Sequence, residues 1–197
     1  MASPRRRVLG IPLALLVAAT GAAHARYEGN LNLVVGKKWL QNGDWAPVEE
    51  QQDIGLMFAF AEERIPVQFA FDVFRSHDNG PSGAQPDGTP VDGQTTEFAV
   101  GFRKTWGTHV FHPHLGAGGN VIQAEMNTAS PTGQVNRGDR GYGVWIDGGM
   151  TWRVAGHLNL GFEVRYSKAD VDLSSGFETM EAAAGGLHVG GIIGYGW

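Results

Sequence analysis

The chain of 197 residues contains no cysteine. Without thiols it can form neither a disulfide framework nor a thiolate metal site. Hydrogen bonding and packing must therefore supply the stability of the fold.

Basic residues are also scarce. Three of the 15 basic residues and none of the 20 acidic residues lie within residues 1–25, so the rest of the chain carries 12 against 20, formally −8. Nucleic-acid binding requires a basic surface. This charge balance excludes nucleic acid as a partner.

Long apolar runs are missing beyond residue 25. None approaches the roughly 20 residues that a membrane-spanning helix requires. Membrane insertion of this part of the chain would therefore have to use strands. The 30 glycines, and prolines concentrated between the patterned segments, favour strands and turns.

The N-terminus has the composition of an export signal. Three arginines precede a short apolar core at residues 8–19, and Ala23-His24-Ala25 matches a cleavage site. The sequence predicts a cleavable signal peptide over residues 1–25 and one domain over residues 26–197. A membrane-anchored helix is the alternative interpretation of the first segment.

Eight segments alternate large apolar residues with small or polar ones. The clearest places Leu158, Leu160 and Phe162 opposite Asn159 and Gly161. This period of two over about ten residues is typical of transmembrane strands. The segments are residues 30–39, 52–60, 67–75, 96–105, 110–122, 143–153, 157–166 and 187–197.

The connections alternate in length. Long links at 40–51, 76–94, 123–142 and 167–186 are separated by short links at 61–66, 106–109 and 154–156. All long links of an up-and-down meander lie at one end, as in outer-membrane barrels with short periplasmic turns and long extracellular loops. The sequence therefore predicts an all-β, eight-stranded antiparallel transmembrane barrel.

The two strand faces decide between a membrane barrel and a soluble ligand-binding barrel. A soluble barrel would carry its charges on the outside. Here the charged face is otherwise rich in glycine and alanine, which fits the narrow lumen of eight strands. Charges of both signs can neutralise one another there. The predicted lumen network comprises Asp53, Asp72, Glu97, Arg103, Asp147, Arg153, Glu163 and Arg165.

Aromatic residues cluster near the strand ends, where membrane barrels carry girdles at the two lipid–water interfaces. The predicted outer girdle comprises Trp39, Tyr142 and Tyr166. The predicted inner girdle comprises Trp106, Trp152, Tyr195 and Trp197.

The chain resembles the small eight-stranded outer-membrane barrels of Gram-negative bacteria, which include the transmembrane domain of outer membrane protein A. The resemblance covers residues 27–197 and rests on the signal, the strand pattern, the loop asymmetry and the terminal Gly194-Tyr195-Gly196-Trp197. It implies a place in the cell outer membrane, in contact with lipid and lipopolysaccharide. It also implies that the barrel assembly machinery reads Tyr195 and Trp197 as an assembly signal.

Fold alone does not fix function. We expect a non-enzymatic barrel without a cofactor, whose extracellular loops contact a ligand or surface partner. The alternatives are a narrow pore or transporter for small solutes and, with less support, a lipid-modifying enzyme.

Three short motifs have a chemical interpretation. His112 and His114 share a face and would need a third ligand to hold a metal, while Pro113 between them suggests a bulge. Ser76-His77-Asp78 has the residue types of a hydrolase triad, but triads are normally assembled from distant positions. The last long link is acidic, and a solvated loop is the simpler interpretation than a Ca²⁺ or Mg²⁺ site. Its acids are Asp170, Asp172, Glu178 and Glu181.

Overall fold

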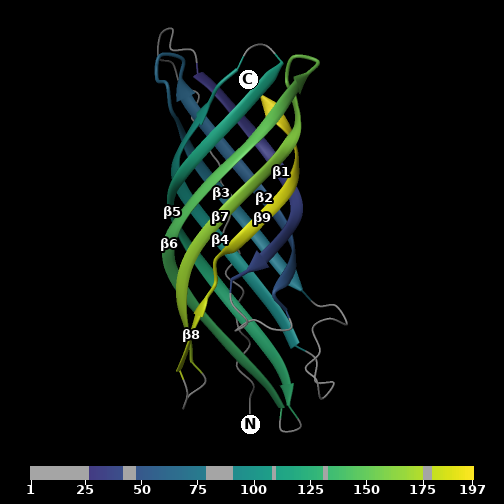
Figure 1. The fold of residues 1–197 in the computed structure, drawn as a ribbon, viewed down its shortest axis with the longest axis vertical. Helices are drawn as coiled ribbons and strands as arrows, with labels where there is room; N and C mark the ends of the chain where they lie inside the picture. The colour runs from purple at the N-terminus through teal and green to yellow at the C-terminus, as the bar shows by residue number, and fades with distance from the viewer. Residues whose placement is uncertain (1–26, 42–47, 79–90, 108–109, 131–132, 175–178) are drawn as a thin grey trace, which may run out of the picture.

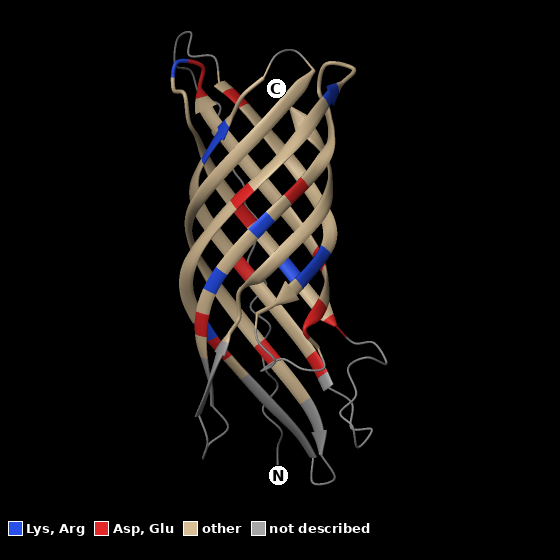
Figure 2. Ribbon diagram, viewed as in Figure 1, with Lys and Arg blue, Asp and Glu red and all other residues tan. Residues whose placement is uncertain are grey.

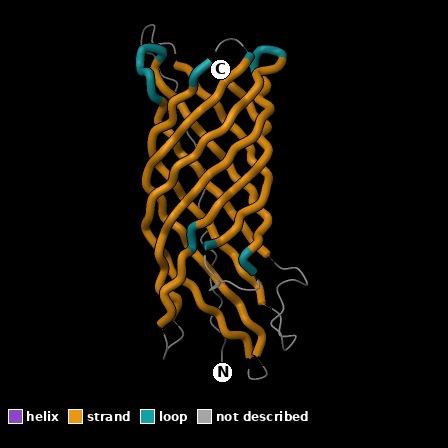
Figure 3. Tube along the Cα trace, viewed as in Figure 1, coloured by secondary structure: helices purple, strands orange, loops and turns teal. Residues whose placement is uncertain are grey.

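The computed structural model describes residues 27–41, 48–78, 91–107, 110–130, 133–174 and 179–197. The predicted signal peptide lies outside these residues. The regular elements of the described residues are all strands, as Figure 3 shows. They are β1 (Tyr27–Leu40), β2 (Glu50–Glu62), β3 (Gln68–Asp78), β4 (Val91–Thr105), β5 (Phe111–Ser130), β6 (Gly133–Val154), β7 (Leu158–Ser174), β8 (Thr179–Ala183) and β9 (Gly186–Gly196).

The strands close into a barrel. Each strand from β1 to β7 pairs antiparallel with the next, and β9 pairs with both β7 and β1. Figure 1 shows these eight strands tilted around one axis, with β8 outside the closed ring. The predicted eight-stranded antiparallel up-and-down barrel is confirmed. Among the described residues, no helix is long and apolar enough to cross a membrane.

The alternation of side chains separates lipid from lumen. On β7, Phe162 and Val164 are 44% and 41% exposed, whereas Glu163 and Arg165, which alternate with them, are buried. The same alternation on the other barrel strands produces an apolar outer belt. Such a surface is suited to contact with lipid. Exposed aliphatic and aromatic residues of the belt include Val35, Leu56, Phe69, Val100, Phe102, Leu115, Ile146 and Ile193.

The short links lie at the end of the barrel that holds the C-terminus (Figure 1). Their backbone makes tight turns: Ala155 and Gly156 have φ of 51° and 85°, and Gly107 has φ of 135°. Short turns characterise the periplasmic end of outer-membrane barrels, and this end is called periplasmic below. The opposite end is called extracellular.

Two of the predicted long loops are wrong in part. Residues 123–142 form most of a hairpin in which β5 and β6 stay paired as far as Ser130 and Gly133. Residues 167–186 contain the end of β7 and all of β8, which pair from Asp170–Ala183 to Ser174–Thr179. The alternation of apolar and polar residues fades there because these strand segments extend beyond the lipid belt. Backbone pairing does not require that alternation and continues.

The expected bulge at Pro113 is also wrong. The register of β5 with β6 runs without interruption from His112–Thr151 through Pro113–Met150 to His114–Gly149. The carbonyl of Pro113 accepts a bond from the Trp106 amide, 2.9 Å away, just past the end of β4. The missing N–H therefore faces the end of the β4 ladder, where little pairing is lost.

The seam between β1 and β9 generates a first prediction. A side chain on the lumen-facing Gly36 would collide with the carbonyl oxygen of Val189, whereas one on the lipid-facing Gly191 meets no atom closer than 4.0 Å. Gly36→Val should therefore destabilise the barrel by about 3 kcal/mol or more. Gly191→Val should leave it nearly unchanged.

Urea unfolding in detergent, followed by the mobility difference between folded and boiled protein on gels, measures both variants. Equal stability of the two would show that β1 and β9 are not packed at this seam.

Candidate functional site: the charged lumen

Two arginines cross-link the lumen at mid-height. Arg103 on β4 contacts Asp72 Oδ2 at 2.9 Å and also contacts Asp147 on β6. Arg165 on β7 contacts the same Asp72 oxygen and Glu97 Oε1, both at 2.8 Å. These side chains are at most 2% exposed, so Asp72 is a shared buried acceptor for two guanidinium groups. Figure 2 shows charged positions meeting on neighbouring strands at this height.

Aromatic rings pack on the guanidinium groups. The Arg165 guanidinium carbon lies 4.4 Å from the Trp145 ring centroid and 4.8 Å from that of Phe74. Such cation–π contacts are favourable when desolvated. Trp145 also donates its indole N–H to the backbone oxygens of Gly119 and Val100. Trp145 therefore fills the lumen and holds the cation cluster on one side.

Glycines make room for this indole. A Cβ on Gly101 would lie 2.8 Å from Trp145 Cζ2, and one on Gly118 would lie 2.9 Å from its Nε1. Both glycines face the lumen on β4 and β5, which pair at these positions. Small residues on two strands thus accommodate one large residue on the third.

A second polar group lies nearer the extracellular end. His188 Nδ1 is 2.8 Å from Asp53 Oδ2, and its Nε2 is 3.8 Å from Glu97 Oε2. Ser76 donates to the other oxygen of Asp53 at 2.7 Å. Lys38 is fully buried and donates to Thr95 Oγ1 at 2.9 Å and to the Ala184 carbonyl at 3.2 Å.

Sequence reasoning missed Lys38. The alternation of the first segment places Lys38 on the same face as Val34 and Gly36, so counting the period of two would have found it. Its neighbour Lys37 lies on the other face of the strand, where it interrupts the apolar series. Lys37 is exposed and contacts Glu50 at the strand end.

An apolar layer closes the extracellular side of the lumen. Its members come from three barrel strands, β1, β5 and β7, and from two links, and they are at most 8% exposed. It lies on the extracellular side of Lys38, whose ammonium group donates to the carbonyl of Ala184 in this layer. The layer comprises Leu40, Val48, Ile122, Ala124, Ala169, Val171 and Ala184.

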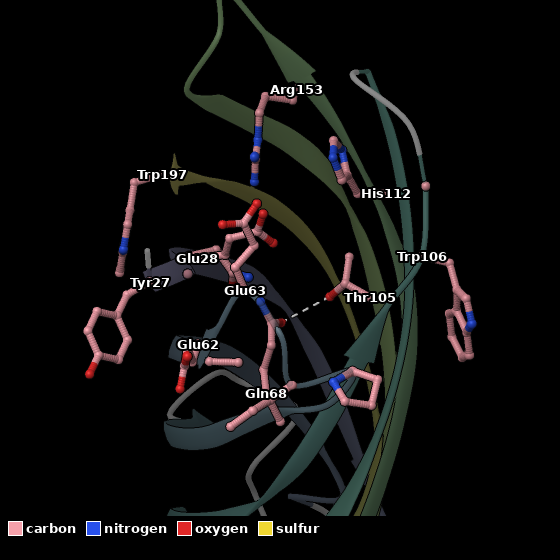
Figure 4. A pocket seen from close by; sticks show the side chains of 16 residues that line it. Tyr27, Glu28, Glu62, Glu63, Gln68, Thr105, Trp106, His112, Arg153 and Trp197 are labelled. Carbon is pink, nitrogen blue, oxygen red and sulfur yellow. Dashed lines mark hydrogen bonds between the residues drawn. The ribbon is translucent and has the colours of Figure 1, made fainter. Parts of the chain in front are cut away.

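The periplasmic end is hollow. A vestibule of about 660 Å³ is bounded by the first residues of β1 and by the short links. Figure 4 shows Arg153, Glu28 and Glu63 turned toward its middle, with Trp106 and Tyr27 at its periphery. Arg153 was predicted as part of the lumen network, but it donates to Asn159 at 3.3 Å and is separate from the mid-height cluster.

Glu163 is the exception among the predicted network residues. Its side chain is buried, yet neither carboxylate oxygen has a hydrogen-bond partner among the described residues. The structure therefore brings Asp72, Glu97, Arg103, Asp147 and Arg165 into one cluster. It places Asp53 beside His188, Arg153 in the vestibule, and Glu163 at the edge of the cluster.

The three short motifs do not assemble sites. His112 and His114 both face the lumen, but among the described residues no group of three His, Cys, Asp or Glu could hold a metal ion. Ser76 is buried while His77 is exposed, since they are neighbours on β3. Glu178 lies outside the described residues, and Asp170 is exposed on β7.

The aromatic residues predicted as girdles all point outward. Their exposed fractions range from 38% for Tyr166 to 81% for Tyr142. Trp197 exchanges backbone hydrogen bonds with Gly29, at 3.0 and 3.2 Å, and its ring lies 6.1 Å from that of Phe58. Tyr195 stacks on His157 at 5.1 Å. These contacts place Tyr195 and Trp197 on the β1–β9 seam at the periplasmic rim.

Removing one partner of the mid-height cluster should be costly. Arg165→Gln leaves the Glu97 and Asp72 carboxylates short of a buried cation, so we expect a loss of about 3–5 kcal/mol in the free energy of unfolding. Lys37→Gln breaks an exposed pair and should cost no more than about 1 kcal/mol.

Guanidine unfolding in detergent, monitored by tryptophan fluorescence, compares the two variants. A loss below about 1 kcal/mol for Arg165→Gln, no larger than that of an exposed pair, would mean that the cluster does not stabilise the barrel.

Comparison with known proteins bears on the fold. No model of a known protein family matches the chain, and no curated protein matches it in sequence. The structure is similar to Ail, the attachment invasion locus protein of Yersinia pestis, with a TM-score of 0.53 and 9% identity over 88% of this chain and 99% of that one. Ail has also been solved in complex with the heparin analogue sucrose octasulfate (TM-score 0.52, 9% identity, 87% and 97% coverage).

A second similar structure is a major outer membrane protein from Thermus thermophilus. It has a TM-score of 0.54 and 6% identity, and the match covers 87% of this chain and 98% of that one. Identities this low show the fold alone. That fold and the apolar belt agree with the predicted location in the cell outer membrane. By its fold, this chain is an eight-stranded outer-membrane β-barrel.

Proposed function

We propose that the chain is a closed, non-enzymatic barrel that anchors an interaction surface on the outside of the cell. The observation that carries this proposal is the filling of the lumen. An ion-pair cluster occupies mid-height, and an apolar layer lies between this cluster and the extracellular end. A barrel filled in this way is a rigid support for the strands that extend beyond the membrane.

The same observation opposes the alternative of a pore. A solute entering from the vestibule would have to displace Arg103 and Arg165 from buried carboxylates and then cross the apolar layer. Breaking buried ion pairs costs several kcal/mol per partner lost. On this proposal the barrel transports neither water-soluble ions nor small polar molecules.

The extracellular strands supply the surface. The β5–β6 hairpin continues nine residues beyond Tyr142, to Gly133, which is roughly 30 Å along an extended strand. Outside the belt, segments 41–50, 77–94, 123–141 and 168–185 together carry 12 acidic and three basic residues. The partner that fits this surface is cationic, because opposite charges steer association.

This charge distinguishes the chain from the Ail complex. Sucrose octasulfate is a polyanion, and sequence segments with 12 acidic and three basic residues, a formal charge of −9, repel polyanions. The likeness in fold therefore does not transfer the ligand. A lysine-rich polypeptide is the better probe for this barrel.

Electrical recording tests the closed lumen. Purified barrel inserted into planar lipid bilayers should show no stepwise current, because no continuous water path crosses the charged and apolar layers. Boiled protein and empty bilayers serve as controls. Discrete steps that scale with salt concentration would favour the pore.

Binding measurements test the surface. Barrels in phosphatidylcholine nanodiscs should bind polylysine and not heparin, with affinity that falls as salt rises. The combined variant Glu49→Gln, Asp92→Asn and Asp170→Asn should bind polylysine roughly tenfold more weakly, because it removes exposed extracellular charge.

A matched variant removes the same charge from the other end, through Glu28→Gln, Glu62→Gln and Glu63→Gln. It should retain the binding of the unmodified barrel. Heparin binding, or equal losses in the two variants, would contradict an extracellular cation-binding surface.

We also propose that the barrel assembly machinery recognises Tyr195 and Trp197. Both residues are exposed at the β1–β9 seam. The resemblance in sequence implies that the assembly machinery reads a terminal aromatic strand of this kind. Trp197→Asp should lower the amount of folded barrel in the outer membrane several-fold. Trp106→Asp, at the same membrane interface but off the seam, should lower it far less.

Pulse-labelling followed by the gel mobility of unboiled membranes measures folding in cells. Similar yields for the two variants would reduce Trp197 to an interfacial anchor.

A further inference from the structure

Glu163 is a buried carboxylate with no partner. Both of its oxygens are inaccessible to solvent and lack a hydrogen bond among the described residues. The other acids of the lumen are bonded: Asp72 and Asp147 to Arg103, Glu97 to Arg165, and Asp53 to His188. A buried charge without compensation is too costly to persist. Something must therefore neutralise Glu163.

The balance of charge in the lumen leads to the same point. The buried acids of the described residues number five, and the buried lysine and arginines are Lys38, Arg103 and Arg165. His188, between Asp53 and Glu97, supplies a fourth positive charge when protonated. Even with His188 protonated, the acids exceed the cations by one, and the carboxylate without a bond is Glu163.

Two further polar atoms without partners lie beside it. Asp147 Oδ1 and His114 Nε2 are buried and have no hydrogen bond in the described part of the chain. His114, Gly149 and Glu163 stand in register on β5, β6 and β7. A Cβ on Gly149 would lie 2.7 Å from His114 Cε1 and 2.9 Å from Nε2, so the imidazole covers this glycine on the side of β7. Three buried polar side chains that lack hydrogen bonds for at least one atom thus lie on the adjacent strands β5, β6 and β7.

A small cavity on the periplasmic side of the lumen reaches His114. The cavity of about 20 Å³, room for about one water molecule, is lined by His114, Arg103 and Thr151. It shares Arg153 and His112 with the vestibule. A polar route therefore leads from the periplasmic solvent to His114, while the apolar layer blocks the extracellular side.

From this arrangement we infer that Glu163, with Asp147 and His114 on the neighbouring strands, binds one proton that enters from the periplasm. The proton removes the negative charge that no cation of the ion-pair cluster compensates.

The groups that face Glu163 set the sign of the effect. Arg103 on β4 and Arg165 on β7 attract its negative charge, whereas Asp147 on β6 and Asp72 on β3 repel it. His114 stands in register with Glu163 on β5. On β9 the residue paired with Glu163 is Gly190, which has no side chain. Both arginines are already bonded to other carboxylates, so they do not replace the bound proton.

Infrared spectra of the barrel in lipid vesicles give a direct test for a proton. The unmodified barrel should show the C=O stretching band of a protonated carboxylic acid at neutral pH, and Glu163→Gln should abolish it. The unfolding midpoint of the unmodified barrel should also fall by several degrees as the pH is raised from mildly acidic to mildly alkaline, because the proton is lost. Glu163→Gln should remove that fall.

An alkali-metal ion at Glu163 in place of the proton would overturn the inference. No such band would then appear, and the midpoint of the unmodified barrel would rise when NaCl or KCl replaces N-methylglucamine chloride at constant ionic strength. Both titrations are made on the unmodified barrel and need no variant.

Glu97→Gln is the matched control because it removes a carboxylate that Arg165 holds. It should lower the midpoint at every pH and keep the dependence on pH. If the unmodified barrel lacks the band, or if Glu163→Gln and Glu97→Gln behave alike, the inference is overturned.

Discussion

The structure depends on one constraint, that no backbone hydrogen-bonding group in a bilayer can be left unpaired. For strands the constraint is met only by closure, which pairs β9 with β1. Eight strands close around a lumen that side chains fill. Polar residues in that lumen are removed from water, so a buried charge is costly unless an opposite charge on another strand compensates it. Asp72, Arg103 and Arg165 meet at mid-height for this reason.

The fold was largely predictable because lipid on one face and a narrow lumen on the other enforce a period of two. The prediction weakened where that enforcement stops. Beyond Tyr142 backbone pairing carries the β5–β6 hairpin on to Ser130 and Gly133, and backbone bonds leave no mark on side-chain polarity. The inward face of each strand was predictable, but the partner of each charge depends on register and stagger. Sequence therefore grouped Arg153 with Arg165, although the two occupy different heights of the lumen.

The two ends of the lumen differ in a way that bears on function. The periplasmic end holds a polar vestibule, and the extracellular end holds a dry layer of aliphatic side chains. Material from the periplasm can approach the charged cluster, while the cell exterior meets only the projecting strands and links. The barrel therefore keeps a buried, one-sided interior separate from an outward-facing acidic surface, and the two can be altered independently.

The seam between β1 and β9 also determines how long the protein lasts. It joins segments from opposite ends of the described chain, as the mutual bonds of Gly29 and Trp197 show. Opening it would expose two strand edges to hydrocarbon at once, and each unpaired group costs several kcal/mol there. Partial opening of the seam is therefore not a small fluctuation, because it requires crossing a high free-energy barrier. A barrel closed in this way persists through slow unfolding rather than through a large equilibrium stability.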